Sequence, residues 1–69
     1  MNFYLIRNAK GKVLHYIRGE LFWNTINGVE SVLDNTQFET KEKADQFIKE
    51  KGILNATGVV EVTLALRDV

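Results

Sequence analysis

Only one segment of this chain has the pattern of an amphipathic helix, so a helix can cover a sheet formed by the remaining residues on one face only. The helix is predicted over residues 41–51. Thr40 is a good N-cap, and Gly52 fits the position after the helix where a left-handed backbone closes it. We expect Ile53 to contact Ile48 in this closure. The apolar stripe of the helix consists of Ala44, Phe47 and Ile48.

The rest of the chain predicts short strands separated by turns. Strands are expected at residues 3–7, 13–18, 21–26 and 59–67. Turn residues occur at 8–11, 19–20 and 27–28. The segment 29–33 either returns as a further strand or forms one loose helical turn.

These elements predict a single α+β domain over residues 1–69. Its sheet is small, twisted and antiparallel-dominated, with four to five strands in the order β-β-β-(β)-α-β, and it packs on the single helix. The segment 59–67 is the longest predicted strand, and its apolar content suits a central position.

Large apolar residues occur on both faces of the first three predicted strands, whereas a sheet with one wet face alternates cleanly between apolar and polar residues. The sheet can curl over its second face, residues 29–38 can fold across it, or a homodimer or other protein partner can cover it. We expect some of its large side chains to be accessible to solvent. The candidate partner-binding residues are Tyr4, Ile6, Tyr16, Arg18 and Trp23, and whether Tyr16 and Trp23 share a face depends on the register set by the turn between their strands.

Composition argues against most kinds of chemistry. The 69 residues include no cysteine and one histidine, which excludes disulfides, thiolate metal sites and sites with several histidines. His15 has no recognisable catalytic partners in the sequence. We therefore expect no catalytic, cofactor-binding or metal site and no enzyme activity. Without cysteine, an export signal or a membrane span, a cytoplasmic location is favoured.

Nine basic residues balance nine acidic ones, so the bulk charge gives no support to nucleic-acid binding. One alternative nevertheless remains open, a weak single-stranded nucleic-acid binder that uses sheet aromatics and arginines. Its candidate residues are Tyr4, Tyr16, Trp23, Arg7 and Arg18. Aromatic residues also favour strands for packing reasons alone.

Two stretches, FYLIRNAKGKVL and FETKEKADQFIKEKG, resemble small, largely uncharacterised phage and prophage proteins of Gram-positive bacteria. The resemblance implies an accessory role in a phage or mobile element, and it transfers no catalytic residue. The leading hypothesis is thus a small non-enzymatic protein-interaction module that binds a host protein or self-associates through an apolar sheet face.

Overall fold

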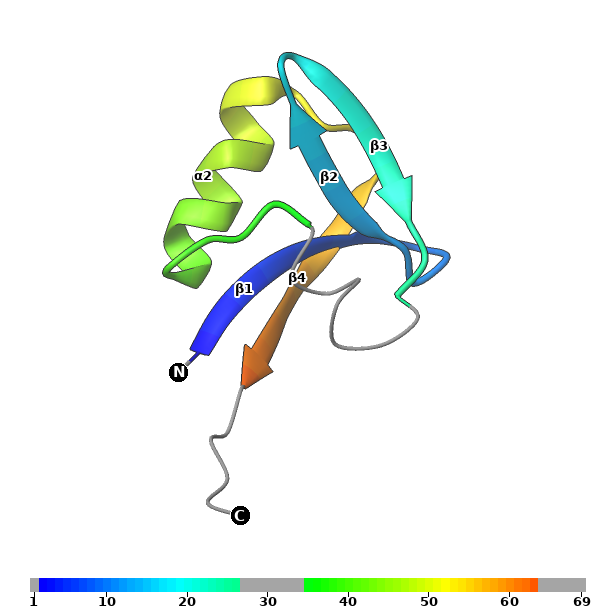
Figure 1. The fold of residues 1–69 in the computed structure, drawn as a ribbon. Coiled ribbons are helices and arrows are strands. Elements are labelled where there is room, and N and C mark those ends of the chain that lie inside the picture. Colours follow the sequence, from blue (N-terminus) through cyan, green and yellow to red (C-terminus); the bar gives the residue numbers. More distant parts are fainter. Residues whose placement is uncertain (1, 27–34, 64–69) are drawn as a thin grey trace.

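The structure, a computed structural model, describes residues 2–26 and 35–63. Within these ranges it consists of four strands and one helix (Figure 1), which confirms the predicted α+β class. The elements are β1 (Asn2–Asn8), β2 (Val13–Ile17), β3 (Glu20–Asn24), α2 (Lys41–Lys51) and β4 (Ala56–Thr63). The predicted turn at residues 27–28, the segment 29–33 and the predicted strand end at 64–67 lie outside the described residues.

The strand order is β3-β2-β1-β4, with antiparallel neighbours throughout. Among the described residues β4 pairs with β1 alone, so the expected central position of the last strand is wrong. The interior strands are β2 and β1, and in β1 the adjacent residues Leu5 and Ile6 point to opposite faces and are both 0% exposed. Strand β4 also begins earlier than predicted. A register shift near Thr57 lets Ala56 pair with Asn8.

β1 and β2 pair only beside their shared turn and then diverge (Figure 1), with Arg7 opposite Val13 as their one pair in register. The opening is filled by residues 36–38, here called the wedge. The Thr36 amide donates to the Leu14 carbonyl at 3.1 Å, and the Thr36 hydroxyl accepts from the Tyr16 amide at 2.7 Å. On the other side, Phe38 and Tyr4 exchange two backbone hydrogen bonds of 2.8 and 2.9 Å. The wedge thereby satisfies backbone groups that the splayed hairpin leaves unpaired.

The turn between β2 and β3 lies one residue earlier than predicted. Ile17 pairs with Glu20, which leaves Arg18 and Gly19 as the two loop residues. Both have positive φ, 53° and 80°, as a type I′ hairpin turn requires. Arg18 therefore belongs to the turn instead of to the strand, and Glu20 is the first residue of β3.

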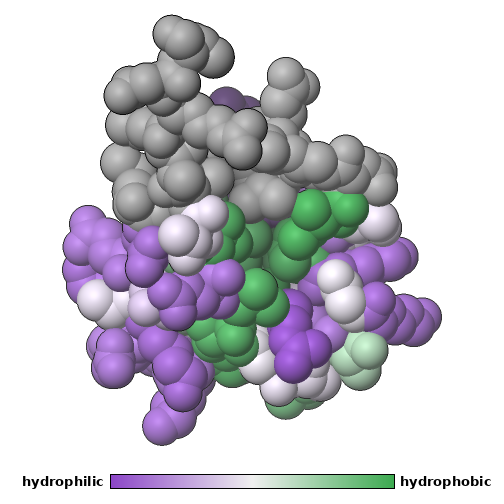
Figure 2. All heavy atoms as spheres, turned by 90° about the horizontal axis from the view of Figure 1, so that it is seen from below, coloured by the Kyte–Doolittle hydropathy of each residue, from purple (hydrophilic) through white to green (hydrophobic). Residues whose placement is uncertain are grey.

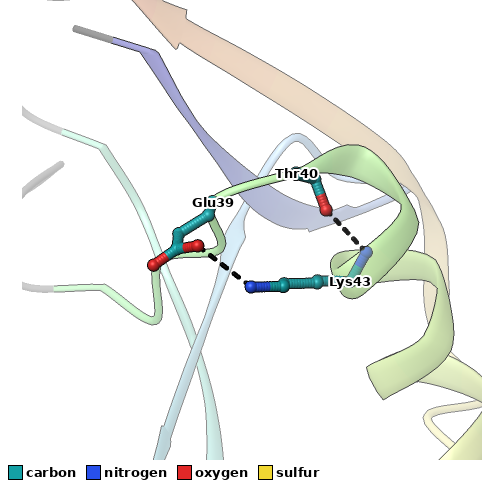
Figure 3. A network of polar contacts seen from close by, with 3 residues as sticks. All are labelled: Glu39, Thr40 and Lys43. Atoms are coloured by element: carbon teal, nitrogen blue, oxygen red, sulfur yellow. Dashed lines mark hydrogen bonds and ion pairs between the residues drawn. The ribbon is translucent and has the colours of Figure 1, made fainter.

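The predicted helix and its two caps are confirmed. The Lys43 amide donates to the Thr40 hydroxyl at 3.1 Å (Figure 3), which satisfies one of the free amides at the helix start. Gly52 has a φ of 62°, and its amide donates to the Ile48 carbonyl. The Ile53 amide donates to the same carbonyl at 3.1 Å. Local residue types alone are enough to define this element.

The core consists of two clusters on opposite faces of the sheet. One is centred on the buried residues Ile6, Leu14, Ala44 and Ile53, and α2 covers it. The other contains the buried residues Phe3, Leu5 and Val13, with Val62 packed against them. Neither described range includes a helix of the length and apolar character needed to span a bilayer.

Candidate functional site

The five residues predicted to bind a partner do not form one exposed surface. Ile6 is 0% exposed and lies in the core cluster under α2. Tyr16 and Trp23 are half-buried and pack against the same cluster, and Tyr4 is half-buried beside the wedge. Only Arg18, in the turn, is fully accessible. Tyr4, Tyr16 and Trp23 remain partly accessible, as expected. However, the sheet face that carries Ile6, Tyr16 and Trp23, which was expected to be uncovered, is the face that α2 covers.

Aromatic packing explains why α2 covers the sheet face that carries Ile6, Tyr16 and Trp23. The Tyr16 ring meets the Phe47 ring edge-on, with 5.2 Å between their centroids. Phe38 of the wedge contacts Phe47 at the same centroid separation. The Lys51 ammonium lies 5.8 Å from the centroid of the Tyr16 ring, within cation–π range. These contacts bury the apolar stripe of α2 against the sheet.

Three of the five exposed large apolar side chains of the described residues lie on the β2–β3 hairpin, and the other two are Ile26 and Leu54. Ile17 and Phe22 are each 48% exposed and Leu21 is 39% exposed. We call these three residues the hairpin patch. The cross-strand pairs place Phe22 opposite His15 and Leu21 opposite Tyr16, so Phe22 and Leu21 point to opposite faces of β3. The patch therefore surrounds the edge of the sheet instead of covering one face.

The hairpin patch is not among the residues predicted from the sequence, because the predicted turn lies one residue later than the observed one. A signal for it was present, since ELFWN has no lysine or proline to protect an edge strand. A two-residue loop makes Ile17 and Glu20 a hydrogen-bonded pair. Along an antiparallel ladder, hydrogen-bonded pairs alternate with non-hydrogen-bonded ones, so Leu21 and Trp23 belong to non-hydrogen-bonded pairs with β2. The backbone groups of Leu21 and Trp23 consequently point away from β2. Among the described residues no strand pairs with them.

His15 lies in a side-chain network with Asn24 and Asn35. The Asn24 side-chain nitrogen donates to the Asn35 side-chain oxygen at 3.0 Å and lies 3.3 Å from the Nδ1 atom of His15. Because an amide nitrogen can only donate, Nδ1 acts as the acceptor in this pair. The network ties β2 and β3 to Asn35, which is 6% exposed. In the described part of the chain, no three histidine, aspartate or glutamate side chains gather in a way that could hold a metal ion.

The base-stacking platform considered from the sequence is not assembled on the sheet. Tyr16 and Trp23 lie on the face that α2 covers. Arg7 pairs with Val13 and Gly58 and belongs to the opposite face, where its guanidinium lies over Gly58. These two aromatic rings and this arginine therefore lie on opposite faces of the sheet.

The surface at the end of the molecule where β1 begins differs in character from the hairpin patch. Seen from below, hydrophobic residues form a central band with hydrophilic residues on both sides (Figure 2). At this end a shallow cavity of about 330 Å³ is lined by Asn2, Phe3, Gln37, Phe38 and Glu39. Its described lining residues include one carboxylate and no cation.

Comparison of the chain with protein-family models, with curated proteins and with solved structures gives no match. Among residues 2–26 and 35–63, the hairpin patch and the edge of β3, with which no described strand pairs, are the features that most favour an interaction.

Proposed function

We propose that this chain is a non-enzymatic protein-interaction module that self-associates by pairing β3 of one copy with β3 of a second copy. The observation that carries the proposal is the exposure of Leu21 and Phe22 on opposite faces of one edge strand. A partner that docks on one face of the sheet covers only one of them. A strand added to the edge covers both and also binds the outward backbone groups.

The residues of β3 are compatible with pairing about a two-fold axis at Phe22. In an antiparallel arrangement the two Phe22 side chains face each other in a non-hydrogen-bonded pair, the closer of the two pair types. Leu21 lies opposite Trp23 of the second copy, and their outward backbone groups exchange hydrogen bonds. Glu20, the one charged residue of β3, lies opposite Asn24, so no like charges meet.

The sequence adds the setting in which such a module works. Its resemblance to phage and prophage proteins supports an accessory role in a bacterial host, and the absence of cysteine suits the reducing cytoplasm. In this proposal the self-associated form is the one that binds further partners, because it presents two copies of every surface.

The experiment that tests the proposal is sedimentation equilibrium over a wide range of protein concentration, with two matched lysine variants. Phe22→Lys places a charge at the centre of the proposed interface, where it faces its own copy. Leu54→Lys makes the same kind of change at a residue that is 94% exposed and lies outside the hairpin. We expect the wild type and Leu54→Lys to dimerise equally and Phe22→Lys to remain monomeric, with unchanged circular dichroism.

Amide hydrogen exchange separates edge pairing from packing between faces. Edge pairing protects the Leu21 and Trp23 amides as the protein concentration rises, whereas packing between faces leaves them exchanging at the same rate. A wild-type chain that stays monomeric throughout, or a Phe22→Lys variant that dimerises like the wild type, would contradict the proposal.

A further inference from the structure

A cavity of about 400 Å³ opens at the turn that joins β1 to β2, separate from the residues of the hairpin patch. Three segments that are far apart in the sequence contribute to its wall: the turn itself, β3, and the loop between α2 and β4. The lining residues are Asn8, Ala9, Lys10, Lys12, Trp23 and Asn55. Its volume is within the range of about 300–1,000 Å³ that is usual for small-molecule sites.

The backbone that carries the two lysines is held in place by Asn8. The Asn8 side-chain oxygen accepts hydrogen bonds from the Lys10 and Lys12 amides, both at 3.0 Å. The Asn8 amide also donates to the Lys12 carbonyl at 2.9 Å, and the Gly11 amide donates to the Asn8 carbonyl at 3.1 Å. Because Asn8 is only 9% exposed, its side chain fixes the turn from the inside. The lysines therefore project from a preorganised loop.

Lys10 and Lys12 bring positive charge to the wall of the cavity. Within residues 2–26 and 35–63 no acidic residue lines it, and neither Lys10 nor Lys12 forms an ion pair. Trp23 adds an aromatic wall, and Asn55 adds an amide that can both donate and accept. An aromatic wall beside two cations matches a planar ring that carries an anionic group.

We propose that this cavity binds a nucleotide unit, either free or at an exposed position of a single strand. The nucleobase contacts the indole of Trp23, the phosphate lies between the ammonium groups of Lys10 and Lys12, and the Asn55 amide binds the edge of the base. This site shares Trp23 with the proposed pairing through β3, in which the backbone of Trp23 faces the second copy, whereas its other lining residues lie outside that strand. It also differs from a stacking surface on the sheet, because its cations come from the turn and not from Arg7 or Arg18.

Trp23 is the only tryptophan in the chain, so its fluorescence reports on this cavity when the protein concentration, and with it any pairing through β3, is held constant. Titrations of the full chain with adenosine 5′-monophosphate, with adenosine, with inorganic phosphate and with a single-stranded oligodeoxyadenylate test both halves of the site. We expect a saturable change with the monophosphate, the oligonucleotide or both, binding that weakens with added salt, and at least about tenfold weaker binding of adenosine and of phosphate. Comparing the monophosphate with the oligonucleotide distinguishes a free nucleotide from a strand.

The variant that decides the question is Lys10→Gln combined with Lys12→Gln, because replacing Trp23 would also disturb the core against which it packs. Its control is Lys41→Gln combined with Lys49→Gln, which removes the same charge from two exposed positions of α2. We expect the first pair to weaken binding by about tenfold or more and the control to leave it unchanged. No saturable signal from either nucleotide probe, or equal affinity in the two double variants, would overturn the proposal.

Discussion

Two side-chain contacts at the start of α2 involve Glu39, Thr40 and Lys43 (Figure 3), and they differ in how much they stabilise the helix. The Thr40 hydroxyl accepts from a helix amide that has no partner within the helix, so it stabilises the helix end directly. The Lys43 ammonium meets the Glu39 carboxylate at 2.9 Å, but both side chains are mostly exposed. An exposed ion pair of this kind contributes little to stability because water and salt screen it.

The ion pair should still change the titration of Glu39 measurably. The hydrogen bond from Lys43, followed by its positive charge, lowers the pKa of Glu39 below its ordinary value. Because the folded-state pKa is the lower one, the small stabilisation is complete above the ordinary pKa. It is lost as the pH falls through the lowered pKa. We expect carboxyl chemical shifts to give a lowered pKa for Glu39 in the wild type and in Lys49→Gln, and its ordinary value in Lys43→Gln. A pKa that does not respond to Lys43→Gln would assign the shift to another cause.

At the scale of elements, the parts that residue types define locally were predictable. Thr40 and Gly52 mark the two ends of α2, and both caps lie where their side-chain and backbone preferences place them. The turn at Asn8 was likewise expected from residue type. The two hydrogen bonds that its side chain accepts are formed entirely within that turn.

What could not be predicted depends on contacts between distant segments. Both faces of the sheet are apolar, so alternation alone does not indicate which face α2 covers. The choice rests on the fit of Phe47 against Tyr16 and Phe38, which no short-range pattern encodes. The turn at Arg18 was missed because arginine rarely adopts a positive φ, and the pairing of β2 with β3 holds it there. The wrong prediction for the candidate site follows from these two features, the face that α2 covers and the position of the turn at Arg18.

The wedge is the least predictable element, and it supports a test. Thr36→Val keeps the shape of the side chain but removes the oxygen that accepts from the Tyr16 amide. That amide then lacks its partner between the splayed strands, and we expect the free energy of unfolding to fall by about 1–3 kcal/mol. Urea denaturation measures the change. Thr36→Ser, which keeps the hydroxyl, should lose much less. Equal stability of the valine variant and the wild type would show that the wedge does not depend on this bond.

For the molecule as a whole, the folded state of a small chain with two small core clusters is stabilised by any binding that only the folded state can make. The fully buried side chains of the described residues are few, and the largest are Leu5, Ile6, Leu14 and Val13. Meanwhile the hairpin patch leaves apolar surface on the edge of the sheet. Pairing through β3 would bury that surface, extend the sheet across two chains and couple self-association to folding.

This coupling predicts that thermal stability depends on protein concentration. If folding and dimerisation occur together, a tenfold rise in concentration stabilises the dimer by about 1.4 kcal/mol. For two chains of this length the midpoint of thermal unfolding then rises by about 4 °C, as circular dichroism would record. Phe22→Lys should unfold at one temperature whatever its concentration, because a monomer has no such dependence. Leu54→Lys should follow the wild type, since its charge lies away from β3. A wild-type midpoint that does not change with concentration would show that folding does not depend on association. The stability of the chain would then come from its own two core clusters.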